Sequence, residues 1–215
     1  FKPGGLSRFG LDPESVASRW PHLVHASITG FGTASDQALP GYDLLAQALS
    51  GMMTVTGEAE GAPQRSGVAI FDVITGLHAA VGVLGALHER TASGRGQHLE
   101  LNLLSSALSG LVNQAAASVA GGVTPTRMGN DHPSLFPYGP FPASDRDLVI
   151  AVGNDRQFTR LSEEIGHPEL AEDERFITMK ARNEHRDILR PLLVQALSTR
   201  TAGEWFPLLR DAGVP

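Results

Sequence analysis

One carboxylate, Asp72, lies where a predicted strand meets a predicted helix. The β-prone run 68–71 precedes it, and an apolar pattern with a 3.6-residue period follows it. That pattern predicts a mostly buried helix whose inward positions are Leu77, Val81, Leu84 and Leu87. A carboxylate at a helix start faces free N–H groups and the positive end of the helix dipole, which favour its ionised form. Such a group is either a plain N-cap or a nucleophile, because carboxylates form covalent acyl intermediates.

A second carboxylate, Asp43, stands at the start of another predicted helix. It follows a polar loop that ends in Pro40, Gly41 and Tyr42, and the helix continues through residue 49. Capping of its own helix is again the plain alternative to a role in chemistry.

The segment 129–140 gathers polar side chains of a different kind. It contains His132, Ser134 and Tyr138 among three prolines and two glycines, a composition that excludes a helix or a central strand. A long loop with these side chains is either an active-site loop or a linker.

The elements around these residues predict an α/β segment followed by a smaller unit. Asp12 and Pro13 open a helix, and a capping box at Thr201 and Glu204 opens another. Further elements are predicted as strands at 22–28, 98–103 and 148–152 and as helices at 104–119, 155–165 and 182–197. The domains expected are therefore 1–125, a loop at 126–140, and a small α+β domain at 141–215.

Composition excludes several classes of function. A net charge of −6 without a basic stripe argues against a nucleic-acid partner, and the absence of cysteine removes disulfides, thiolate metal sites and a cysteine nucleophile. His22 and His25 would face opposite sides of a strand, so we expect no metal site there. We find no apolar run long enough to span a membrane and no signal peptide, and the expected location is the cytoplasm.

Several blocks of the chain resemble the family III CoA-transferases of the CaiB/BaiF type. Among them are Pro-Gly-Tyr-Asp-Leu-Leu-Ala-Gln-Ala, Gly-Val-Ala-Ile-Phe-Asp-Val-Ile-Thr-Gly and Gly-Asn-Asp-His-Pro-Ser, and all occur in the family's order. The family includes formyl-CoA, carnitine and succinyl-CoA-dependent dicarboxylate CoA-transferases. The resemblance implies part of a Rossmann-like large domain followed by a small α+β domain. It also implies that the chain, which opens at Phe1 without a methionine, is a central fragment of a protein about twice as long.

The resemblance also implies roles for particular residues. Asp72 matches the nucleophilic aspartate, which attacks the acyl-CoA thioester to give a mixed anhydride and later carries CoA as an aspartyl thioester. The residues expected to contact CoA are Arg8, Pro40, Gly41, Tyr42 and Asp43. The substrate loop is expected to hold a small carboxylic or dicarboxylic acid with His132, Ser134 and Tyr138. The family implies acyl-CoA as substrate, no prosthetic group, no metal and an interlocked homodimer, and we expect this fragment to be inactive by itself.

Two alternatives stay open. The α-methylacyl-CoA racemases share the fold, but they use a histidine base where this chain has Tyr42, and an ordinary tyrosine is a poor base at neutral pH. The other alternative is a non-catalytic acyl-CoA-binding or interaction fragment. Among acceptor acids, the loop favours a dicarboxylate other than oxalate, because the formyl-CoA enzymes use a loop richer in glycine.

Overall fold

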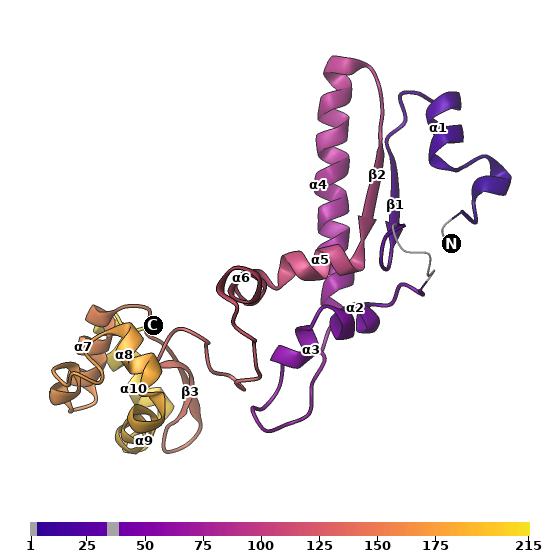
Figure 1. The fold of residues 1–215 in the computed structure, drawn as a ribbon. Helices are drawn as coiled ribbons and strands as arrows, with labels where there is room; N and C mark the ends of the chain where they lie inside the picture. The colour runs from indigo at the N-terminus through magenta and orange to yellow at the C-terminus, as the bar shows by residue number, and fades with distance from the viewer. Residues whose placement is uncertain (1–3, 34–38) are drawn as a thin grey trace. The chain divides into compact units, whose positions relative to one another are not determined.

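The computed structural model describes residues 4–33 and 39–215, and its contacts divide the chain into unit 1, Phe1–Arg127, and unit 2, Met128–Pro215. Unit 1 comprises η1 (Ser7–Phe9), α1 (Pro13–Arg19), β1 (His25–Thr29), α2 (Asp43–Leu49), α3 (Met52–Val55), α4 (Ile70–Ser93), β2 (His98–Asn102), α5 (Leu103–Gly110) and α6 (Val112–Gly121). Unit 2 comprises β3 (Tyr138–Pro142), β4 (Asp147–Ala151), α7 (Asp155–Glu164), η2 (Pro168–Ala171), α8 (Met179–Glu184), α9 (Arg186–Leu197) and α10 (Ala202–Asp211). The mixture of helices and paired strands confirms the predicted α/β class (Figure 1).

Unit 1 is organised around the 24-residue helix α4 and a parallel pair of strands. The register of β1 and β2 runs from His25 opposite His98 to Thr29 opposite Asn102. Figure 1 shows both strands lying alongside α4, while α5 crosses α4 near its N-terminal end. The strands predicted at 22–28 and 98–103 are thus confirmed as β1 and β2, and their carboxyl ends lie at the same edge.

The predicted strand at 68–71 is wrong, because α4 already begins at Ile70. Asp72 is therefore the third residue of the helix and does not stand at its junction with a strand. Ala69 is the N-cap and offers no side-chain hydrogen bond. The cap comes from a residue far away in the sequence, as described below. The β-prone residues 68–71 therefore give no local indication that a helix begins among them.

The expectation that α4 is mostly buried is also wrong for this chain. Phe71, Thr75 and Ala86 are buried, but Leu77 and Val81 are 61% and 70% exposed, and Val73 and Leu84 share that open apolar face. Among the described residues, α4 is the one helix long and apolar enough to cross a membrane, and the bent pair α5 and α6 would qualify only if counted as one span. Core helices of soluble proteins meet the same criteria of length and composition.

The predicted helix at 104–119 is two helices. α5 and α6 meet at an angle of 83°, and Val112 at the joint has a φ of 39°. A left-handed conformation at a β-branched residue interrupts the helical hydrogen bonding, so the chain turns there. The sequence pattern of small residues is continuous across the joint and does not show the turn.

A close approach of two glycines fixes the loop in front of α2 to the end of β1. A Cβ atom on Gly30 would lie 2.5 Å from the Cα of Gly41, and one on Gly41 would lie 2.9 Å from the nitrogen of Gly30. No real side chain tolerates such contacts. The Gly30 carbonyl also accepts a hydrogen bond from the Leu104 amide at 3.0 Å. The end of β1, the start of α5 and the entry to α2 are therefore held together.

Unit 2 packs helices against the antiparallel hairpin of β3 and β4. Its core includes the rings of Phe136, Phe141, Phe158 and Trp205, and the Trp205 indole donates to the Leu197 carbonyl at 2.7 Å. The capping box predicted at Thr201 and Glu204 is confirmed. The predicted helix at 182–197 is divided into α8 and α9 at His185.

Candidate active site

Asp72 presents its carboxylate from the first turn of α4. The side chain is exposed, and no group in residues 4–33 and 39–215 donates a hydrogen bond to it. Phe71 on one side of it is buried and belongs to a small core with Ala46, Leu103 and Ala107. A buried neighbour on a packed helix fixes the backbone of Asp72 while its oxygens remain free to react.

Asp43 supplies the cap that α4 lacks locally. Its Oδ1 accepts hydrogen bonds from the amides of Phe71 at 2.7 Å and Asp72 at 3.2 Å. Its Oδ2 accepts from the side-chain amide of Gln47, one turn further along α2. Asp43 is 9% exposed, so its carboxylate is committed to protein groups. The structure thus brings together the two carboxylates singled out from the sequence, but the backbone of Asp72 makes the contact.

The remaining residues predicted to contact CoA lie on the surface of unit 1. Pro40, Gly41 and Tyr42 directly precede Asp43, and Tyr42 is 66% exposed. Arg8 lies in η1, and its guanidinium sits over the Phe9 ring at 4.6 Å from the centroid. Pro40, Gly41 and Tyr42 therefore lie beside the start of α4, whereas Arg8 belongs to a separate element.

The substrate-loop residues gather within unit 2. His132 Nδ1 accepts hydrogen bonds from the amides of Ser134 and Leu135, both at 3.1 Å, and lies 3.3 Å from Ser134 Oγ. The His132 and Tyr138 rings contact each other with centroids 5.2 Å apart. Since Nδ1 is an acceptor, a neutral His132 carries its proton on Nε2. The cluster thereby offers an N–H, a hydroxyl and a phenol in one place.

Three side chains of α8 and α9 anchor this loop. Asn183 donates to the Pro133 carbonyl at 3.2 Å, and Arg186 donates to the His132 carbonyl at 3.0 Å. Arg186 and Arg190 both pair with Asp131, which is mostly buried. Of the two interpretations left open by the sequence, a linker between the units is wrong, because residues 129–140 belong to unit 2; an active-site role stays a prediction. Arg186 and Arg190 are one helical turn apart and therefore lie on the same face of α9. That spacing was the signal in the sequence for a shared partner such as Asp131.

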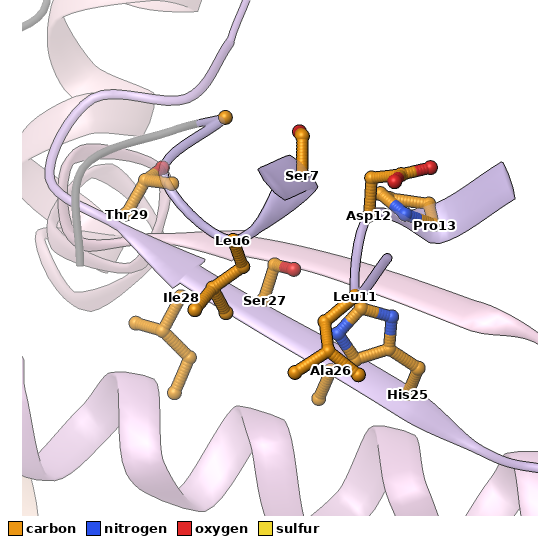
Figure 2. A pocket seen from close by; sticks show the side chains of 11 residues that line it. Leu6, Ser7, Leu11, Asp12, Pro13, His25, Ala26, Ser27, Ile28 and Thr29 are labelled. Atoms are coloured by element: carbon orange, nitrogen blue, oxygen red, sulfur yellow. The ribbon is translucent and has the colours of Figure 1, made fainter. Parts of the chain in front are cut away.

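A hollow of about 270 Å³ opens on unit 1 between β1 and the segment from η1 to α1. Figure 2 shows its wall formed by β1, including His25 and Ile28, with Leu6 and Leu11 from the N-terminal segment. His25 stacks against His98 with centroids 5.0 Å apart, and burial together with this neighbour lowers the pKa of His98. None of the predicted site residues lines the hollow.

Sequence reasoning missed Gln47 at the candidate site. It is fully buried, and it is the partner of Asp43 on the same face of α2. Its position four residues after a carboxylate on a helix was a usable signal, because such pairs meet on one face. Within the described ranges, no group of three His, Cys, Asp or Glu side chains could hold a metal ion.

Comparison with known proteins identifies relatives of the chain. The profile of CoA-transferase family III matches residues 1–215. The chain is 42% identical over 202 residues to a succinate–glutarate CoA-transferase of Agrobacterium fabrum, covering 94% of this chain and 50% of that relative. It is 37% identical to an acetyl-CoA:oxalate CoA-transferase of Acetobacter aceti, covering 100% of this chain and 56% of that protein.

Solved structures agree with these matches. A CaiB/BaiF family protein of Brucella suis superposes with a TM-score of 0.81 at 42% identity, covering 100% of this chain and 57% of that one. A protein of Mycobacterium tuberculosis gives a TM-score of 0.88 at 29% identity and is covered to 58%. The chain thus spans about half the length of the proteins it matches.

Proposed function

Since the chain belongs to CoA-transferase family III, we propose that the full-length protein moves CoA from an acyl-CoA donor to a small carboxylic acid, with Asp72 as the nucleophile. The observation that carries the proposal is the free, exposed carboxylate of Asp72 on a backbone held by Asp43. A carboxylate without hydrogen-bond donors is a better nucleophile than one that is tied to its own helix.

The chemistry balances through two covalent states. The Asp72 carboxylate attacks the donor thioester, giving a mixed anhydride and CoA thiolate, and the thiolate then attacks the Asp72 carbonyl to release the donor acid. The acceptor carboxylate next attacks the carbonyl of the resulting aspartyl-CoA thioester, which displaces CoA thiolate and forms a second mixed anhydride. Attack by CoA thiolate on the acceptor's carbonyl releases the new acyl-CoA and the Asp72 carboxylate. No proton donor is needed for a thiolate leaving group.

We propose that Ser134, Tyr138 and the Nε2–H of His132 hold a carboxylate of the acid substrate. The support is that these groups already lie together on a loop anchored by α8 and α9. A second carboxylate on the acid, as in a dicarboxylate, gains charge-assisted hydrogen bonds from such donors. Pro40, Gly41, Tyr42 and Arg8 are proposed as contacts of CoA itself.

A screen of acceptor acids tests the function. The full-length protein is mixed with succinyl-CoA and with glutarate, oxalate, mesaconate or a monocarboxylate, and the new acyl-CoA is measured by mass spectrometry. We expect turnover with a dicarboxylate longer than oxalate. His132→Ala is expected to raise the KM of that acid about 10–100-fold, consistent with the loss of one charge-assisted hydrogen bond. Formation of no new acyl-CoA with any of these acids would reject the proposal in favour of a binding module.

Association of the full-length protein is a second expectation. The open apolar face of α4 through Leu77, Val81 and Leu84 is too continuous to remain in water in the functional assembly. We propose that the protein is a homodimer in which such surfaces are covered. Light scattering at micromolar concentration should give twice the mass of one chain. A monomeric mass that persists at tens of micromolar would contradict this.

A further inference from the structure

We propose that Asp43 and Gln47 together act as a positioning device for Asp72, an inference that rests on the function proposed above. Asp43 is more than nine-tenths buried and Gln47 is fully buried, so neither can meet a substrate directly. One oxygen of Asp43 binds the backbone amides of Phe71 and Asp72, at 2.7 and 3.2 Å. The other binds the side-chain amide of Gln47.

Gln47 extends this hold to the chain that leads into α4. Its Oε1 accepts a hydrogen bond from the Ser66 amide at 2.8 Å, and its Nε2 also lies 3.4 Å from the Val68 carbonyl. Two side chains of α2 therefore bind both the approach to α4 and its first turn. Because all these contacts are to backbone, they fix where Asp72 stands relative to α2 whatever the neighbouring side chains are.

Asp43 and Gln47 also determine which hydrogen-bond donors remain near the Asp72 carboxylate. Three amides at the start of α4 have acceptors: that of Ile70 donates to the Val68 carbonyl, and those of Phe71 and Asp72 donate to Asp43. These three amides are therefore not free to bind a developing oxyanion. Asp43 satisfies the end of the helix, so the Asp72 side chain does not have to fold back onto it as a cap.

This geometry predicts that Asp43 acts on the rate of the chemical step and not on the binding of acyl-CoA. Misplacing a reacting group by about 1 Å can cost about 100-fold in rate. A direct CoA contact, as expected from the sequence, would instead affect mainly the KM. The ratio of the two effects therefore separates a positioning role from a binding role.

The test uses two variants of the full-length protein. In Asp43→Asn, the new Nδ2 faces the Gln47 Nε2, so two donors meet and the device is broken. In the double variant Asp43→Asn with Gln47→Glu, the asparagine Nδ2 can donate to one glutamate oxygen, and the other oxygen can still accept from Ser66. The double variant keeps the net charge and restores all the contacts except that with the Val68 carbonyl. Asn154→Ala, which removes an ordinary helix cap on α7, is the matched control.

We expect Asp43→Asn to lower kcat about 100-fold while the KM for acyl-CoA changes less than about threefold. The double variant should recover most of that loss, and Asn154→Ala should lower the denaturation temperature without changing kcat. A raised KM with normal kcat, full activity of Asp43→Asn, or no recovery in the double variant would each overturn the inference. Failure of both variants to fold would reduce the pair to a structural role and overturn it as well.

The wild-type arm separates this inference from the proposed function. An active wild type with unaffected Asp43 variants would reject the positioning role alone. A wild type that forms no new acyl-CoA with any acceptor acid would reject the proposed function and the positioning role together.

Discussion

Replacing Asp72 with asparagine is expected to abolish CoA transfer by the full-length protein and to leave its fold intact. The covalent route has no other first step, and removal of a nucleophile costs about 10⁴-fold or more in kcat. The folded state should lose little, because the Asp72 side chain is exposed and caps nothing. Its favourable interaction with the helix dipole contributes about 0.3–1 kcal/mol.

The matched control for this variant is Asp187→Asn. Asp187 is also an exposed aspartate in the first turn of a helix, α9, so its loss alters the helix end in the same way. Initial rates with a fixed acyl-CoA and acid should be unchanged in the control. Retention of more than a few per cent of wild-type turnover by Asp72→Asn would disprove the nucleophile assignment.

Replacing Arg182 with methionine is expected to destabilise unit 2 by about 3 kcal/mol or more, because two buried carbonyls lose their donor and each costs about 1–3 kcal/mol. The guanidinium is fully buried and donates to the carbonyls of Phe136 at 3.1 Å and Phe176 at 2.8 Å. It also pairs with Asp155 at 2.7 Å and lies over the Phe158 ring. Burial lowers the pKa of Arg182 and Asp155 opposes this, but an arginine stays protonated in proteins.

Chemical denaturation with Lys180→Met as control measures this effect. Lys180 lies on the same helix, α8, and forms an exposed pair with Glu184 at 3.7 Å. Exposed pairs contribute about 0–1 kcal/mol, so the control should unfold close to the wild type. Equal midpoints for Arg182→Met and Lys180→Met would contradict the account of the unit 2 core.

Local signals in the sequence predicted local structure well. Asp12 with Pro13 and Thr201 with Glu204 are caps that act within four residues, and both form as expected. The strands at β1 and β2 follow from short apolar runs bounded by turns. These features depend only on neighbouring residues, which the sequence displays directly.

Long-range partners were not visible in this way. The start of α4 was placed late because its cap, Asp43, lies 28 residues earlier, and no local residue announces it. The exposure of Leu77 and Val81 differs from the expected burial, since a periodic apolar pattern tells which face is apolar but not what covers it. The close contact of Gly30 with Gly41 is likewise a property of two segments brought together by the fold.

The candidate site likewise combines features that depend on neighbouring residues with features that depend on distant ones. Asp72 and Asp43 were identified as carboxylates at helix starts, but which atoms of the two residues meet could be learned only from the structure. His132, Ser134 and Tyr138 were identified as a set because they are close in sequence, and the contacts among them are short-range. Their anchors, Arg186 and Arg190, lie more than 50 residues away and were missed.

The most direct test of the central claim follows oxygen from the acceptor acid into the protein. The full-length protein turns over a saturating acyl-CoA with an acceptor acid whose carboxylates carry ¹⁸O, and its peptides are then mapped by mass spectrometry. In the proposed route the acceptor's oxygen forms the second anhydride and remains on the aspartate when CoA thiolate attacks the acceptor carbonyl. We predict ¹⁸O in the peptide that contains Asp72, located on that side chain by fragmentation. Complete turnover with no label on Asp72 would show that the carboxylate never carries the acyl group, and would contradict the account.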